Sequence, residues 1–164
     1  MEQQPSKAKV GGALEVRRVG IDSEVAARLI RALNAELDSL YPEEGANHFR
    51  LDVEETAPGR GAFLVAFVGG HPVGCGAVRR LGAGTAELKR MYVDPETRGR
   101  GVGHAILNAL ESEARALDAE RLVLEAGDRQ LEAMSLYRRC GFRPIPPFGE
   151  YVDSPLSVCM EKRL

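Results

Sequence analysis

Apolar residues three and four positions apart predict a helix in the first quarter of the chain. Asp22 or Ser23 can cap its N-terminus, because a short polar side chain there accepts from an unpaired backbone N–H. The helix is expected to end where Tyr41 precedes Pro42, since the residue before proline avoids the α conformation. Its apolar stripe consists of Val25, Leu29, Ile30, Leu33, Leu37 and Leu40.

The same spacing predicts two later helices. One covers residues 102–117, and the other covers 130–139 and stops at Gly141, which suits a helix C-terminus. Residues 43–61 are polar and irregular, as binding loops often are, with one helical turn expected near 52–55. We therefore expect about four helices, counting this turn.

Shorter apolar runs predict a mixed sheet of about six to seven strands. Gly69-Gly70 and the turn at 82–85 join three strands into an antiparallel meander. The helix over 102–117 is a crossover connection, so the strands on either side of it are expected to be parallel. The last two strands are expected to form a hairpin. The predicted strands are 14–19, 62–68, 71–81, 86–93, 121–126, 142–145 and 156–161.

Composition is that of an ordinary globular protein. With 164 residues, 44% hydrophobic and 28% charged, the chain can bury a core without a metal or a disulfide. We expect a flexible tail over 1–12 and a single domain over 13–164. The net charge of −2 argues against nucleic-acid binding, which needs a basic face. No apolar run reaches the roughly 18 residues of a membrane span.

The cysteines and histidines favour a reducing compartment and no metal. Cys75, Cys140 and Cys159 are far apart and odd in number, and the three histidines have no ligand spacing. The first 30 residues do not read as a signal peptide. We therefore predict a cytoplasmic protein. Cys140 follows a helix C-terminus, where the dipole disfavours a thiolate, so we interpret it as structural.

One stretch predicts a phosphate site: a strand that ends at Val93, a glycine-rich turn, and a helix start. Backbone N–H groups at a helix N-terminus converge on one point, and glycine lets a ligand approach closely. A nucleotide P-loop would need Lys and Ser/Thr after the turn, but Gly103 is followed by His104. A dinucleotide fingerprint would belong to the first strand of a βαβ unit, but a meander precedes this turn.

Three segments in order resemble the GNAT superfamily of acyl-CoA-dependent N-acetyltransferases, over roughly residues 14–164. They are ELKRMYVDP from Glu87, the turn Arg98-x-x-Gly101-x-Gly103, and LYRRCGF from Leu136. One departure is Gln130, where the family often has Asn seven residues before the tyrosine. The resemblance implies acetyl-CoA as acyl donor and a fourth and fifth strand that splay to admit it. The implied cofactor contacts are Met91, Tyr92, Val93, Arg98, Gly99, Arg100, Gly101, Val102, Gly103, His104, Gln130 and Tyr137.

The resemblance also implies direct transfer to an amine without a covalent enzyme intermediate. An amine of ordinary pKa is neutral in only about one molecule in 10³ at pH 7, so a base must take a proton. Glu87 is the first candidate for this base, and Glu125 on the neighbouring strand is the second. The non-catalytic alternative is that Glu87 forms an ordinary ion pair with Lys89 or Arg121. Tyr137 resembles the family's general acid. A backbone N–H near Met91 or Tyr92 would hold the oxyanion.

The acceptor is expected to be a small amine or a peptide amine. Candidate acceptor contacts are aromatic or charged residues on the predicted loops and central strands. A protein lysine or N-terminal acceptor, or an acyl-CoA sensor without transfer, are the alternatives. The family's last strands often pair across dimers, so a homodimer is possible. The candidate contacts are Tyr41, His48, Arg79, Glu125, Phe148 and Tyr151.

Overall fold

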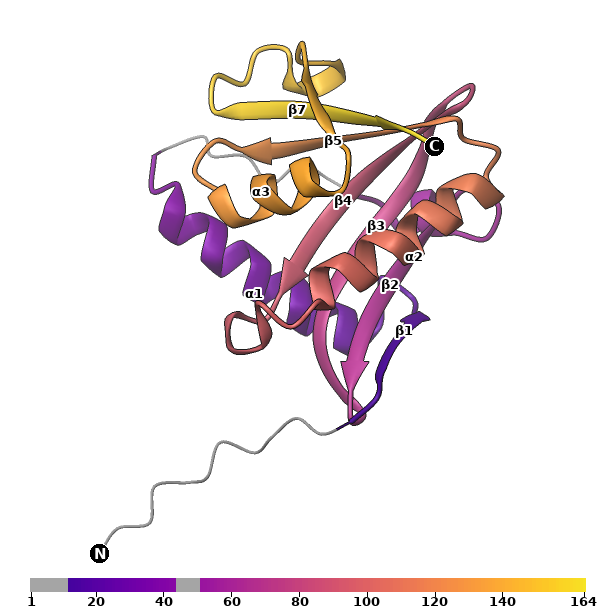
Figure 1. The fold of residues 1–164 in the computed structure, drawn as a ribbon, viewed down its shortest axis with the longest axis vertical. Helices are drawn as coiled ribbons and strands as arrows, with labels where there is room; N and C mark the ends of the chain where they lie inside the picture. Colours follow the sequence, from indigo (N-terminus) through magenta and orange to yellow (C-terminus); the bar gives the residue numbers. More distant parts are fainter. Residues whose placement is uncertain (1–11, 44–50) are drawn as a thin grey trace, which may run out of the picture.

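Seven strands form one mixed sheet in the order β1-β2-β3-β4-β5-β7-β6 (Figure 1). The computed structural model describes residues 12–43 and 51–164. All neighbours are antiparallel except β4 and β5, which are parallel as predicted. The strands are β1 (Leu14–Arg18), β2 (Gly61–Val68), β3 (His71–Gly82), β4 (Thr85–Val93), β5 (Arg121–Gly127), β6 (Arg143–Ile145) and β7 (Ser157–Arg163).

The described residues contain three α-helices: α1 (Glu24–Leu40), α2 (Val102–Ala116) and α3 (Leu131–Arg139). Ser23 caps α1, its side chain accepting from the Ala26 N–H at 3.3 Å. The expectation of about four helices is corrected in one respect, because the turn predicted near 52–55 is a short 3-10 helix, Val53–Thr56. Within these ranges no helix combines the length and apolarity needed to cross a bilayer.

The helices cover opposite faces of the sheet. Residues of α2 and α3 pack with β-strand residues in the larger core, and α1 packs in a separate, smaller core on the other face (Figure 1). Alternation along the strands then assigns each side chain to a face. Leu88 of β4 and Leu124 of β5 belong to the α2 core, so Glu87 and Glu125 point to the α1 face.

Strands β4 and β5 pair only at their beginnings. Their register runs from Thr85 opposite Arg121 to Leu88 opposite Leu124 and then ceases, although both strands continue. A β-bulge in β4 follows directly, since Cys75 pairs with Tyr92 but Ala77 with Lys89. The bulge places Arg90 at φ 58, a left-handed conformation that a non-glycine residue seldom adopts. The two strands therefore diverge at the centre of the sheet, as expected from the resemblance.

Strand β7 lies between β5 and β6. It pairs with β6 as the predicted hairpin and also, over its whole length, with β5. The connection from β6 to β7 crosses the α1 side and contains a short 3-10 helix, Gly149–Tyr151. This connection brings Tyr151 next to Glu87 of β4, 64 residues away in sequence.

Candidate active site

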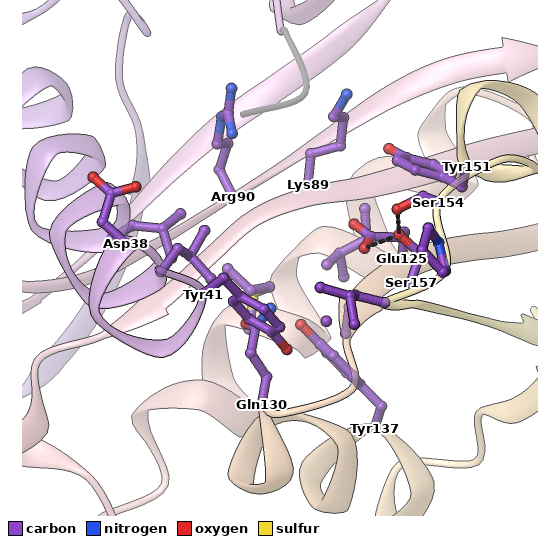
Figure 2. Close-up of a pocket in the computed structure, with 18 of the residues that line it drawn as sticks. Asp38, Tyr41, Lys89, Arg90, Glu125, Gln130, Tyr137, Tyr151, Ser154 and Ser157 are labelled. Carbon is purple, nitrogen blue, oxygen red and sulfur yellow. Dashed lines mark hydrogen bonds between the residues drawn. The ribbon is translucent and has the colours of Figure 1, made fainter. Parts of the chain in front are cut away.

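A cavity of about 470 Å³ opens where β4 and β5 separate (Figure 2). Its wall is made by both strands, by the C-terminal half of α1, by α3 and by the β6–β7 connection. The residues that line it include Leu33, Leu37, Asp38, Tyr41, Leu88, Lys89, Arg90, Met91, Glu125, Ala126, Gly127, Gln130, Tyr137, Tyr151, Ser154 and Ser157.

The residues that line the cavity come from both faces of the sheet. On the α2 side the wall includes Leu88, Met91 and Tyr137, which belong to or pack against the larger core. On the α1 side it includes Leu33 and Leu37 of α1, the ammonium of Lys89, the carboxylate of Glu125 and the hydroxyl-bearing Tyr151. A ligand that enters from the α2 side would therefore meet an apolar channel first and a carboxylate at its end.

Strand β5 contributes the acidic residue Glu125 to the cavity wall. Its Oε1 accepts a hydrogen bond from Ser157 Oγ at 2.8 Å, and Ser157 Oγ lies 2.7 Å from Ser154 Oγ. Burial raises the pKa of Glu125 above its ordinary value, the Ser157 hydrogen bond opposes that rise, and the charge of nearby Glu87 adds to it. A carboxylate with a raised pKa is a better proton acceptor than an exposed one.

Tyr137 of α3 projects its hydroxyl into the cavity from the opposite face (Figure 2). The side chain is 4% exposed and packs against Phe142, with ring centroids 5.7 Å apart. Burial raises the pKa of Tyr137 well above its ordinary value, and the charge of Glu125 raises it further. The phenol is therefore protonated at neutral pH and can donate its O–H to a ligand.

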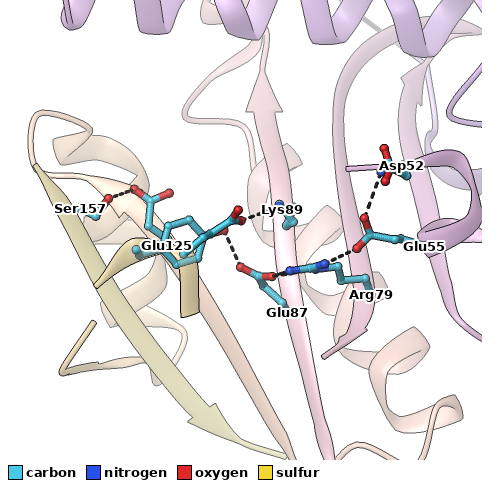
Figure 3. Close-up of polar contacts among 9 residues, drawn as sticks. Asp52, Glu55, Arg79, Glu87, Lys89, Glu125 and Ser157 are labelled. Carbon is cyan, nitrogen blue, oxygen red and sulfur yellow. Dashed lines mark hydrogen bonds and ion pairs between the residues drawn. The ribbon is translucent and has the colours of Figure 1, made fainter. Parts of the chain in front are cut away.

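Glu87 does not line the cavity; its side chain lies between Arg79 and Tyr151 and has a relative exposure of 0% (Figure 3). Its Oε1 accepts from Arg79 Nε at 2.8 Å and pairs with Arg79 Nη2 at 2.7 Å, and its Oε2 accepts from the Tyr151 hydroxyl at 2.7 Å. Arg79 also pairs with Glu55 of the 3-10 helix. Burial would lower the pKa of Arg79, but the two glutamates raise it, so the guanidinium stays charged.

The glycine-rich turn leads into α2 without a side-chain cap. Gly101 occupies the N-cap position at φ 83, where any side chain would be strained, and it supplies no side-chain cap to the first turn. Arg98 anchors the turn, since its Nε donates to the Val93 carbonyl at 3.0 Å and its Nη2 pairs with Glu36 of α1 at 2.6 Å. Arg100 is exposed beside the turn. The first N–H groups of α2 thus remain available to an anion.

Sequence and structure comparisons agree with this geometry. Residues 26–142 match the model of the acetyltransferase (GNAT) family. An IAA acetyltransferase of Azospirillum brasilense is 42% identical over 142 residues, which cover 86% of this chain and 92% of that protein.

The chain belongs to the GNAT acetyltransferase family.

Further relatives extend the likeness over most of the chain. YsnE, an N-acetyltransferase of Bacillus subtilis, is 30% identical over 151 residues, covering 89% of this chain and 99% of its own. A Klebsiella pneumoniae protein, provisionally described as an acyl-CoA N-acyltransferase, superposes with a TM-score of 0.80 at 34% identity, covering 92% and 97% of the two chains. PaiA N-acetyltransferase from Thermoplasma acidophilum, solved with coenzyme A, has the same fold, with a TM-score of 0.72 at 20% identity over 93% and 99%. The family's acyl donor is acetyl-CoA.

The cavity of this GNAT acetyltransferase collects about a third of the site residues predicted from sequence. Tyr41, Met91, Gln130, Tyr137, Glu125 and Tyr151 line it. Gln130 occupies the N-cap of α3, and the Tyr41 hydroxyl donates to Asp128 Oδ1 at 3.3 Å and accepts from the Arg129 N–H at 2.5 Å. Position 127 beside the Tyr41 ring has to be glycine, because a Cβ there would lie 2.2 Å from the Tyr41 hydroxyl oxygen.

Other predicted residues lie outside the cavity wall. Arg79 and Glu87 form the buried ion pair. Of the alternative partners of Glu87, Arg121 pairs with Glu161, and Lys89, which does line the cavity, pairs with Glu150. Phe148 stacks edge-on against Tyr151. Tyr92 packs in the α1 core, Gly99, Val102 and Gly103 belong to the turn and the start of α2, and exposed His104 lies 3.4 Å from Cys140 Sγ. His48 falls outside the described residues.

Several wall residues were not predicted. Lys89 and Arg90 lie at the bulge in β4, Ser154 comes from the β6–β7 connection, and Ser157 is the first residue of β7. The motif that contains Lys89 and Arg90 was recognised, but the bulge that determines where their side chains point has no sequence signal. Neither serine belongs to a recognisable sequence motif. Ser157 comes near Glu125 only because β7 pairs with β5, which places Ser157 opposite Gly127, two residues beyond Glu125.

Proposed function

We propose that this protein transfers the acetyl group of acetyl-CoA directly to a primary amine bound on the α1 side of the cavity. The observation that carries the proposal is the cavity at the point where β4 and β5 stop pairing, lined by Glu125 from one face of the sheet and Tyr137 from the other. A thioester threaded between β4 and β5 would place its carbonyl between a proton acceptor for the amine and a donor for the sulfur. That order is the one that aminolysis of a thioester requires.

The cofactor would extend from the glycine-rich turn to the cavity. Its diphosphate would bind the N–H groups at the start of α2, with Arg100 nearby and Arg98 keeping the turn in place. The pantetheine arm would run along the unpaired part of β4, from Val93 and Tyr92 to Met91. The β-bulge turns backbone groups of this segment out of the ladder, and one of its N–H groups would hold the developing oxyanion.

Glu125 is the group best placed to take the proton of the acceptor. Glu87 was the first candidate from sequence, but its carboxylate is wholly buried and both of its oxygens already accept hydrogen bonds. Glu125 lines the cavity, and burial raises its pKa toward that of a useful base. We therefore assign proton abstraction to Glu125 rather than to Glu87.

The positions and raised pKa values of the cysteines favour direct attack by the amine over a covalent enzyme intermediate. None of the three lines the cavity in the described part of the chain. Burial raises the pKa of Cys75 to about 12 and also raises those of Cys140 and Cys159. All three thiols are thus poor nucleophiles at neutral pH. In the direct reaction the nitrogen–carbon bond forms, the carbon–sulfur bond breaks, and the amine's proton ends on the thiol.

The Tyr137 hydroxyl would stabilise the departing sulfur. Because its pKa is raised well above that of an ordinary thiol, we expect a hydrogen bond to the thiolate rather than early proton transfer. Tyr137→Phe should lower kcat by about 10–100-fold, the low end of acid catalysis, since a thiolate already leaves readily. Stopped-flow thiol release measures this. Acetyl-CoA affinity should stay within about twofold, and an unchanged kcat would remove Tyr137 from the mechanism.

The pH dependence of kcat should report Glu125. A base must be ionised to act, so activity should fall as the pH drops through its raised pKa. The Ser157 hydrogen bond stabilises the ionised form, and Ser157→Ala should therefore move the acid limb of the profile to higher pH. Profiles of kcat for both proteins check this. A limb that stays in place, or moves to lower pH, would show that another group titrates.

The experiment that tests the function is release of free thiol from acetyl-CoA with a panel of amines. The panel contains amino acids, polyamines, aminoglycosides and lysine-containing peptides. Release that depends on a small amine supports the proposal, and release only with peptides would favour a protein acceptor. Tight acetyl-CoA binding with no release for any acceptor would favour a sensor.

A further inference from the structure

A group of contacts at the C-terminal end of α1 has no part in the reaction as described so far. The last turn of α1 contains no basic residue, although the carbonyl groups there favour a positive charge. Arg129, which follows β5, supplies that charge, since its Nη1 donates to the Leu40 carbonyl at 2.8 Å. Its Nη2 pairs with Glu43 at 2.5 Å, and its guanidinium carbon lies 5.0 Å from the centre of the Tyr41 ring.

The Tyr41 hydroxyl makes the same connection from inside the cavity. It donates to Asp128 Oδ1 at 3.3 Å and accepts from the Arg129 N–H at 2.5 Å. Burial raises the pKa of Tyr41, so the phenol keeps the proton that it donates. The ring is 7% exposed and lies directly against Gly127, the last residue of β5. We call Tyr41, Asp128 and Arg129 the clasp.

The clasp joins two parts of the protein that the sheet leaves separate at this end. The pairing of β4 with β5 stops at Leu88 and Leu124. Beyond that point α1 packs with β2 and β3 in the smaller core, whereas the turn 127–130 leads into α3 in the larger core. A second link is Arg98, which pairs with Glu36 of α1 at 2.6 Å and with the exposed Glu132 of α3 at 3.5 Å. The gap between the strands is therefore tied at both ends.

We infer that Tyr41 is a positioning residue, because the clasp sets the width of the gap in which the pantetheine arm of acetyl-CoA lies. The inference rests on the proposed function and gives Tyr41 a role toward the acyl donor, whereas the sequence suggested an acceptor contact. Tyr41, Gly127 and Gln130 all line the cavity beside this gap (Figure 2). A gap that is already held at its width lets the arm bind without first ordering the turn 127–130, so less binding free energy is lost.

The test compares two ligands that differ by the arm. Acetyl-CoA contains it, and 3′-phospho-ADP is the nucleotide half of coenzyme A alone. Tyr41→Phe keeps the ring but removes both hydrogen bonds of the hydroxyl, and it should raise the Kd of acetyl-CoA by about tenfold, the worth of one good hydrogen bond. The Kd of 3′-phospho-ADP should stay within about twofold, because its phosphates bind the start of α2 and not the gap. Isothermal titration calorimetry measures both values.

Arg129→Met tests the clasp from its exposed side. It removes the side-chain contacts with the end of α1 but keeps the backbone N–H that Tyr41 accepts. Because exposed ion pairs and cation–π contacts are weak, the Kd of acetyl-CoA should rise by about threefold. Arg139→Met is the matched control. Arg139 is exposed on α3 and its Nε donates to the Ser135 carbonyl of the same helix, so neither Kd should change.

The two ligands also separate positioning from a merely structural role. If the Kd of both ligands rises in parallel in folded Tyr41→Phe, the substitution loosens the whole site and the inference is overturned. An unchanged Kd of acetyl-CoA in folded Tyr41→Phe overturns it as well, and Arg129→Met decides the question by the same criteria if Tyr41→Phe does not fold. If the unaltered protein binds no acetyl-CoA, the proposed function itself fails, and the inference fails with it.

Discussion

Replacing Glu125 with glutamine should lower kcat for an amine acceptor by about 10²–10⁴-fold, the range that general-base catalysis usually supplies. The amide has nearly the same shape and can still bond to Ser157, but it cannot accept a proton at neutral pH. The acid limb of the pH profile should disappear together with the rate. Steady-state thiol release across pH measures both effects, and acetyl-CoA titration should show unchanged binding.

Glu87→Gln is the matched comparison, because both residues point to the α1 face from neighbouring strands. Glu87 is wholly buried and its oxygens already accept from Arg79 and Tyr151, so its replacement should leave the acid limb in place. If Glu87→Gln abolishes the limb and Glu125→Gln retains it, the two roles must be exchanged.

Arg79→Met should destabilise the fold by about 3–5 kcal/mol, the usual cost of removing one partner from a buried ion pair. The loss would leave the wholly buried Glu87 carboxylate with the Tyr151 hydroxyl alone, and Glu55 without its guanidinium. Urea unfolding followed by circular dichroism gives the change in free energy. The midpoint should fall without a large change in slope, because the native sheet is the same.

Arg115→Met is the control for this substitution. Arg115 lies on α2 with 54% of its side chain exposed, and its contact with Glu111 is 4.0 Å. Exposed pairs contribute about 0–1 kcal/mol, so this change should be small. Adding Glu87→Leu to Arg79→Met should restore part of the lost stability, because no buried charge then lacks a partner. A double variant less stable than the single one would contradict this explanation.

The secondary structure follows closely from local patterns. Ser23 and Pro42 bracket α1, and Gly141 follows α3 at φ 96, so these boundaries needed no tertiary information. The place of β7 between β5 and β6 did need it, because a predicted hairpin does not say which of its edges joins the sheet. The bulge at Arg90 is also non-local, since it depends on the register with β3.

The sequence predicts which region of the chain forms the candidate site, but not which residue has which role in it. Glu87 and Glu125 each lie one residue from the last pair of the β4–β5 ladder, Leu88 and Leu124, and point to the same face, so only burial and partners distinguish their roles. Counting across the hairpin from the turn at 82–85 would place Arg80 opposite Glu87, and a register irregularity between Arg80 and Gly82 brings Arg79 there instead. The contact of Tyr151 with Glu87 has no local signal either, because it depends on a loop that folds back over the sheet.

The central claim is direct transfer of an acetyl group from acetyl-CoA to an amine in the opening between β4 and β5. The most direct measurement is mass spectrometry of the reaction with acetyl-CoA labelled in its acetyl carbonyl, with and without the best amine of the panel. The account predicts N-acetylated amine and free coenzyme A in equal amounts, and no label on the protein when the amine is left out. Label retained on the protein, or thiol released at the same rate without amine, would contradict it.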